Sequence, residues 1–216
     1  TAGKTLTFGT WNNNFATSST TVRAMPGSNS SLGIGTFIST STATAATILG
    51  NGNIVITNGI QPALAGGSVV FSSAGTLTLS GASTYTGATT FNGGTFILDA
   101  TGGPASLISG NLATFAGGTF IFKGDATGTG QTLGNITVAA GASSLQVVGG
   151  ASGTTLALGT MTVGTNASMM NINLSGTSPV ITTTTGNTND NLFGTRGAVT
   201  VTTGGTTEFA TRNGSN

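Results

Sequence analysis

The sequence contains no cysteine, no histidine and only four acidic residues among 216. Without cysteine there are no disulfides and no thiolate metal sites. Without histidine, neither a Ser-His-Asp triad, nor a Cys-His pair, nor a His-based zinc centre can be built. Most catalytic constellations are therefore unavailable, and we expect no enzymatic activity, no cofactor and no metal.

Charge is also scarce. Charged residues make up 4% of the chain, and the net charge is +1, whereas ordinary domains carry about 25% charged residues. A nucleic-acid-binding protein needs a cluster of Lys and Arg, and the five cations here are scattered along the sequence. No run of 18 or more apolar residues is present, so we expect no transmembrane helix and no nucleic-acid partner.

The sequence is instead rich in Thr, Ser, Asn and Gly around short alternating apolar stretches. Apolar residues nowhere recur with helical spacing over three turns, so no long helix is predicted. The alternating stretches predict short strands with one inward and one outward face, and the Gly pairs between them predict tight corners.

Short strand-like units repeat along the chain. Self-similarity at about 20–25 residues with a strand in each copy indicates a solenoid. Phe91–Leu98 recurs as Phe115–Phe122 at an offset of 24 residues, Gly75–Leu79 matches Gly94–Leu98 at 19, and Leu133–Val138 returns as Leu158–Val163 at 25.

The alternation within each copy predicts which side chains point inward. If the copies stack, Leu77, Phe96 and Phe120 lie in one apolar column, while Thr76 and its counterparts face outward. We therefore predict an all-β, right-handed parallel β-helix with coils of about 19–25 residues and Gly-rich corners. The whole chain, 1–216, forms one solenoid, and its clearest coils span 76–123. The predicted core ladder consists of Leu77, Leu79, Phe96, Leu98, Phe120, Phe122, Ile136, Val138, Met161 and Val163.

The outward columns contain two distinctive pairs. Asp99 and Lys123 fall one coil apart, about 4.8 Å along the stack, as a surface pair that fixes register. Ile97 and Ile121 also stack, either as a contact patch for a neighbouring rod or because isoleucine favours strands. Asp99 and Asp125 lie about one coil apart in the sequence, and they are the candidates for a glycosidase-like pair.

Residues 10–31 break the strand pattern. The segment TWNNNFATSSTTVRAMPGSNSS contains the single Trp, an Asn run and Pro26–Gly27. These residues are typical of loops and turns, so the segment is predicted to be either a loop insertion or a cap over one end of the stack.

The stretch Leu77–Leu98, LTLSGASTYTGATTFNGGTFIL, resembles the autotransporter-associated β-strand repeat of bacterial passenger domains. The resemblance is to copies in very long secreted proteins of planctomycete and verrucomicrobial type. Residues 187–216 are similar to segments between repeats in such proteins, whereas residues 1–54 share only composition with them. The resemblance implies a secreted β-helical stalk or fibre at the bacterial cell surface, and it brings no catalytic residues.

We therefore expect an extracellular structural protein whose partners are identical copies joined end to end, forming filaments, or further coils of a longer parent chain. A secretion signal would have been removed or would lie outside this chain. One alternative is an adhesin that binds a glycan or a cell surface through its outer ladders or residues 11–26. A more remote alternative is a polysaccharide-processing enzyme that uses Asp99 and Asp125.

Overall fold

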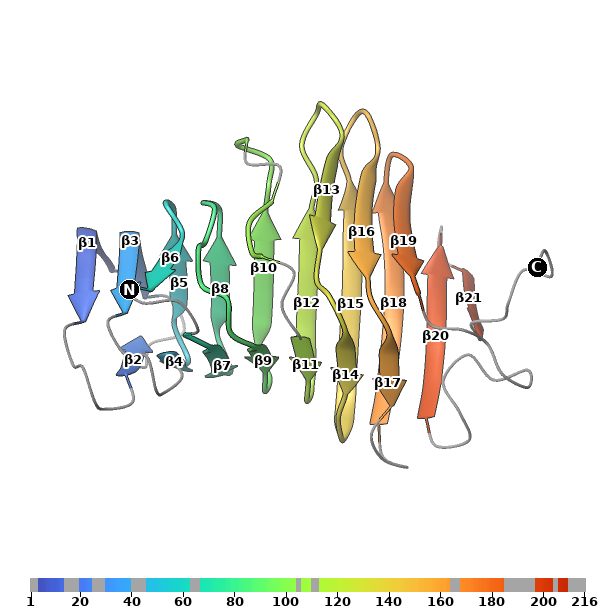
Figure 1. Cartoon of the computed structure of the whole chain (residues 1–216), viewed down its shortest axis with the longest axis horizontal. Helices are drawn as coiled ribbons and strands as arrows, with labels where there is room; N and C mark the ends of the chain where they lie inside the picture. Colours follow the sequence, from blue (N-terminus) through green and yellow to red (C-terminus); the bar gives the residue numbers. More distant parts are fainter. Residues whose placement is uncertain are drawn as a thin grey trace.

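The protein is a parallel β-solenoid, which confirms the predicted fold class (Figure 1). This computed structural model describes residues 4–13, 20–24, 30–39, 46–62, 67–103, 106–109, 113–163, 168–184, 197–203 and 206–209; the side chains of residues 13, 20–24, 39, 62, 197–203 and 206–209 are outside that description. The described residues include no helix, and hence no helix long and apolar enough to cross a membrane.

The longest wall is an eleven-stranded sheet whose strands stand side by side along the molecule (Figure 1). Its strands are β1 (Thr5–Asn13), β3 (Ser31–Ser39), β5 (Asn53–Ile56), β6 (Ile60–Pro62), β8 (Thr76–Leu79), β10 (Thr95–Asp99), β12 (Gly118–Lys123), β15 (Gly141–Gly149), β18 (Ser168–Gly176), β20 (Gly197–Thr203) and β21 (Thr206–Phe209). From β1 to β20, the strands along the main path pair in parallel with the equivalent strand of the next coil; β6 pairs with β3 beside β5.

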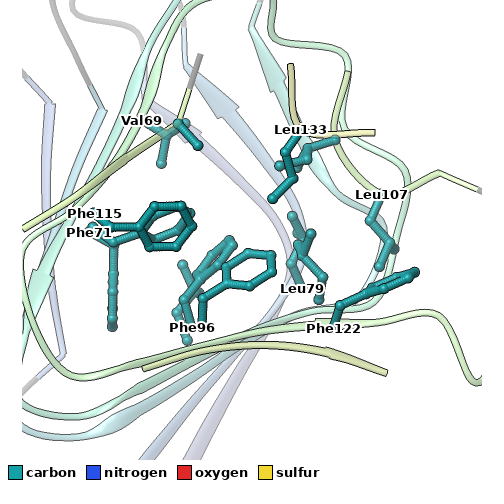
Figure 2. Packing of buried hydrophobic residues seen from close by; sticks show 14 of the residues in the cluster. Val69, Phe71, Leu79, Phe96, Leu107, Phe115, Phe122 and Leu133 are labelled. Carbon is teal, nitrogen blue, oxygen red and sulfur yellow. The ribbon is translucent and has the colours of Figure 1, made fainter. Parts of the chain in front are cut away.

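Two shorter sheets form the other walls. A seven-stranded sheet contains β2 (Thr20–Ala24), β4 (Ala46–Gly50), β7 (Val69–Ser73), β9 (Thr89–Phe91), β11 (Ala113–Phe115), β14 (Ile136–Val138) and β17 (Met161–Val163). A three-stranded sheet contains β13 (Thr129–Thr132), β16 (Thr154–Leu158) and β19 (Pro179–Thr183). Apolar side chains from the different walls meet in the interior (Figure 2).

The predicted register is the observed one. Phe96 pairs with Leu77 on one side and with Phe120 on the other, and Asp99 pairs with Lys123. In the seven-stranded wall Ile136 pairs with Met161. The internal repeat therefore marks residues that lie directly over one another.

The predicted core residues are divided between two walls rather than forming one column. Those between Leu77 and Phe122 line the eleven-stranded wall, while Ile136, Val138 and Met161 line the seven-stranded wall. All are buried except Val163, which is partly buried. Val163 is less covered because β17 is the last described strand of its wall, so no described coil packs over it.

The interior contains a group of phenylalanines from facing walls whose rings contact one another. Phe71, Phe91 and Phe115 come from the seven-stranded wall, and Phe96 and Phe120 come from the eleven-stranded wall. The Phe91 ring centroid lies 4.7 Å from that of Phe96, 5.1 Å from that of Phe115 and 5.4 Å from that of Phe120. Aromatic pairs at such separations add stability beyond their buried area.

Coil length varies more than the predicted 19–25 residues. The step from Thr76 to Thr95 is 19 residues, whereas the step from Ser168 to Gly197 is 29. Between the paired strands the sequence can lengthen without disturbing the register of the ladder. The prediction was too narrow because only the most similar copies revealed a period.

Two details differ from the predicted pattern. Residues 10–31 are not a single loop, because β1 continues to Asn13, β2 spans Thr20–Ala24 and β3 begins at Ser31; residues 14–19 and 25–29 lie outside the described part, and a cap over one end of the stack stays a prediction. The stack is also not wholly parallel, because β21 pairs with β20 in the antiparallel direction. Only two residues of the sequence separate β20 from β21, which is too few for the crossover that a parallel pair needs.

Candidate functional surfaces

The Asp99–Lys123 pair lies on the outer face of the eleven-stranded wall. Lys123 Nζ is 3.7 Å from Asp99 Oδ2, with the two side chains 37% and 22% exposed respectively. The Asp99 carboxylate also accepts hydrogen bonds from the backbone N–H and the hydroxyl of Thr101. An ion pair this exposed contributes about 0.2–1 kcal/mol, so it helps register more than overall stability.

Asp125 lies in the corner between β12 and β13, and its carboxylate is held by its own turn. It accepts hydrogen bonds from the Thr127 hydroxyl at 2.6 Å, the Thr127 N–H at 2.9 Å and the Thr129 hydroxyl at 3.0 Å. These bonds, above all that from the Thr127 hydroxyl, lower the pKa of the Asp125 carboxyl below its ordinary value. The turn therefore favours the ionised carboxylate.

These contacts give little support to the glycosidase-like pair. The Asp99 and Asp125 carboxylates bind different partners, Lys123 and Thr101 in one case and Thr127 and Thr129 in the other. A general acid for glycoside cleavage needs a raised pKa, whereas the pKa of Asp125 is lowered. In the described part of the chain, no group of three or more acidic residues that could hold a metal ion is found.

Two shallow grooves follow the corners of the solenoid. One, of about 410 Å³, runs over stacked turns beside the three-stranded wall and includes Ser152, Thr155, Ser178 and Val180. The other, of about 360 Å³, lies between the two larger walls and includes Asn51, Ser73 and Asn92. Neither is lined by a charged or aromatic residue. Both can contact neutral polar groups, but neither offers an acid, a base or a nucleophile with its base.

Sequence reasoning missed Gln131, a buried polar residue with a structural role. Its side-chain carbonyl accepts hydrogen bonds from the N–H groups of Leu107 at 2.8 Å and Ile108 at 3.3 Å. Its side-chain amide donates to the carbonyl oxygens of Ile108 at 2.8 Å and Thr132 at 2.7 Å. The Gln131 amide thus replaces the backbone ladder between β13 and the irregular segment of the preceding coil.

Tyr85 is a second buried polar residue that serves the fold. Its hydroxyl lies 2.8 Å from the hydroxyl of Thr89, and its backbone carbonyl accepts a hydrogen bond from the Ser109 hydroxyl. Burial raises the pKa of the Tyr85 phenol far above its ordinary value. The Tyr85 phenol therefore stays protonated, and its ring packs in the core while its hydroxyl bonds with that of Thr89.

Residues 72–98 match the model of the passenger-associated transport repeat. The match covers about an eighth of the chain, from the end of β7 to β10. It includes Leu77–Leu98, and it confirms the resemblance to an autotransporter passenger repeat for this segment. The similarity to proteins of planctomycete and verrucomicrobial type stays a prediction. No curated protein and no solved structure matches the chain.

Proposed function

We propose that this chain, a β-solenoid that carries a passenger-associated transport repeat, is a structural stalk segment of a secreted or cell-surface protein. The single observation that supports this best is the continuous parallel ladder of the eleven-stranded wall, with a matched apolar ladder behind it. Each coil is held by its neighbours through backbone hydrogen bonds and side-chain packing. Such an arrangement transmits force along its length without a specific ligand.

A non-catalytic role is part of this proposal. It is supported by the absence of histidine and cysteine from the sequence. It is also supported by the separate hydrogen-bond partners of Asp99 and Asp125 and by grooves without titratable side chains.

Surface display is tested on intact cells that produce the protein, with an antibody raised against the purified chain. The proposal predicts labelling of intact cells and loss of that labelling after brief external protease treatment. Labelling that requires permeabilised cells would overturn it. A periplasmic protein and an outer-membrane protein provide the negative and positive controls.

We further propose that copies of the chain assemble end to end into filaments. Unpaired N–H and C=O groups on a terminal strand can pair with another coil, whether from an identical copy or from a longer parent chain. Leu6, on β1, continues the column of Leu32 and is 58% exposed, so another coil could cover it. Electron microscopy of the concentrated protein should show rods longer than one chain; uniform single particles at every concentration would contradict assembly.

Adhesion to a neutral glycan is the second candidate. It is favoured by the groove beside the three-stranded wall, where the exposed Val180 lies among Ser152, Thr155 and Ser178. An apolar contact surrounded by hydroxyl groups suits a sugar without charge. A glycan array probed with the chain, and with a Val180→Asp variant of the groove, separates the candidates. An adhesin gives specific binding, whereas a purely structural segment gives none.

A further inference from the structure

The outer face of β10 and β12 presents three pairs of neighbouring residues. Thr95 lies beside Thr119, Ile97 beside Ile121, and Asp99 beside Lys123. All six side chains are partly exposed, while the residues between them point into the core. The centre of this face is apolar, and one end of it carries one negative and one positive charge.

This arrangement is complementary to itself. Consider a second copy placed face to face and related by a two-fold axis that runs along the strand direction midway between β10 and β12. Every position on β10 then faces the registered position of β12 on the other copy, and the reverse also holds. Each Asp99 faces a Lys123, each Ile97 faces an Ile121, and each Thr95 faces a Thr119.

The match extends to the neighbouring strands. The same axis brings β8 opposite β15 of the other copy, so that Thr78 faces Gln146 and Thr76 faces Ser144. Hydroxyl and amide groups on these residues can hydrogen-bond across the contact. No like-charge pair is created on the described face, because Asp99 and Lys123 are the charged residues of β8, β10, β12 and β15.

We propose that this face, centred on Ile97, Ile121, Asp99 and Lys123, is a lateral contact between two copies of the solenoid. The face combines an apolar centre, Ile97 and Ile121, with an adjoining pair of opposite charges, and both features are complementary to a second copy. The strands of β8–β15 span about 15 Å across the stack and about 17 Å along each strand. A contact of this size belongs to the weak and reversible class, which repetition along a longer rod would strengthen.

The test uses the whole chain and two charge variants, Asp99→Lys and Lys123→Asp. The first variant has two positive charges on the face and the second has two negative charges, so neither retains the ion pair within the chain. Thr114→Lys, on the outer face of the seven-stranded wall, serves as the matched control. Circular dichroism establishes that each variant is folded, and sedimentation equilibrium gives the association constant at low and moderate salt.

The proposal predicts a concentration-dependent dimer for the wild-type protein and for Thr114→Lys. It predicts at least tenfold weaker self-association for each charge variant, and recovery of the dimer when the two variants are mixed in equal amounts. Added salt should weaken the mixed dimer. A wild-type protein that remains monomeric, or a mixture that associates no better than its components, would overturn the lateral contact. Association that persists equally in both variants and grows beyond a dimer would overturn it too, and would support end-to-end assembly instead.

Discussion

Ser178 adopts a backbone conformation that glycine adopts at the same place in the two preceding coils. Its φ is 45°, while Gly128 and Gly153 have φ of 93° and 91°, and the register of the three-stranded wall places these residues one above another. A side chain disfavours this region because Cβ approaches a backbone oxygen. Ser178→Gly should therefore raise the free energy of unfolding by about 0.5–1 kcal/mol in urea denaturation.

The reciprocal change provides the control. A Cβ at Gly153 would find its nearest neighbour 3.6 Å away, so space is not limiting there. Gly153→Ser should lower the free energy of unfolding by about 1 kcal/mol through backbone strain alone. If both variants shifted stability in the same direction, strain at this turn would not be the cause.

Asp125 should contribute to the pH dependence of stability. Its pKa is lowered from 3.8, first by the Thr127 hydroxyl, so the folded state binds a proton less readily than the unfolded chain does. The contribution is therefore present above the unfolded pKa and disappears as pH falls through the folded pKa. Asp125→Asn should melt at a lower temperature than the wild type at neutral pH, and the two should converge in acid. A difference in melting temperature that is constant down to about pH 2 would contradict this account.

At the scale of the elements, the Gln131 side chain makes the hydrogen bonds to the backbone of Leu107 and Ile108 that a neighbouring strand would otherwise make. Gln131→Leu would remove a hydrogen bond from each of four backbone groups, on Leu107, Ile108 and Thr132. The Ile108 carbonyl would keep its bond from the Ser106 hydroxyl. We predict a loss of about 3 kcal/mol or more, together with faster amide exchange at Leu107 and Ile108. Gln146→Leu is the control, since Gln146 is partly exposed and has one long hydrogen bond of 3.5 Å, to Ser175. Equal losses of unfolding free energy for the two substitutions would show that the buried hydrogen bonds of Gln131 stabilise the fold no more than the single long bond of Gln146.

The facing walls are joined through the phenylalanine cluster. Phe120 is 1% exposed, and its ring centroid lies 5.8 Å from that of Phe96 and 5.7 Å from that of Phe115. Phe120→Ala should cost about 3–5 kcal/mol in free energy of unfolding, whereas Thr119→Ser on the outer face should cost little. Thermal unfolding of both variants measures this difference, and similar midpoints would contradict the inward placement of Phe120.

The strands that could be placed from the sequence are those whose residues recur most clearly in the next copy of the repeat. Two copies of Gly-Gly-Thr-Phe-Ile are enough to place Asp99 beside Lys123 from the sequence alone, and the strand register confirms this placement. Strand β9 has only three residues, so alternation alone could not identify it, although its Thr90 and Phe91 recur as Thr114 and Phe115. The role of Gln131 could not be predicted, because it depends on an irregular segment of the neighbouring coil. The antiparallel direction of β21 did have a signal in the sequence, because Gly204 and Gly205 alone separate two strand-like stretches, a pattern typical of a hairpin.

At the scale of the whole molecule, the solenoid is a stack in which each coil contacts mainly the next. Its low charge removes long-range repulsion between coils and between neighbouring rods. Stability therefore depends on the continuity of the ladder, and a break in one coil separates the stack into two shorter pieces. This property suits a stalk, and the account rests on the coils being stacked in order and in register.

The most direct test of that stacking measures how distance grows along one outward column. The structure aligns Val55, Thr78, Ile97, Ile121, Gln146 and Asn173 through successive strand pairs. Because the chain has no native cysteine, cysteines introduced in pairs can be spin-labelled selectively. One label stays at position 55, and the other is placed at position 121, 146 or 173.

The stacked solenoid predicts separations of about 14, 19 and 24 Å between these pairs of positions, which is an even increase of about 4.8 Å per coil. Electron paramagnetic resonance distance measurements on the three doubly labelled proteins should show this even rise, after the length of the label is taken into account. Distances that fail to increase in this order, or that are broadly distributed, would contradict the stacked architecture and with it the proposed structural role.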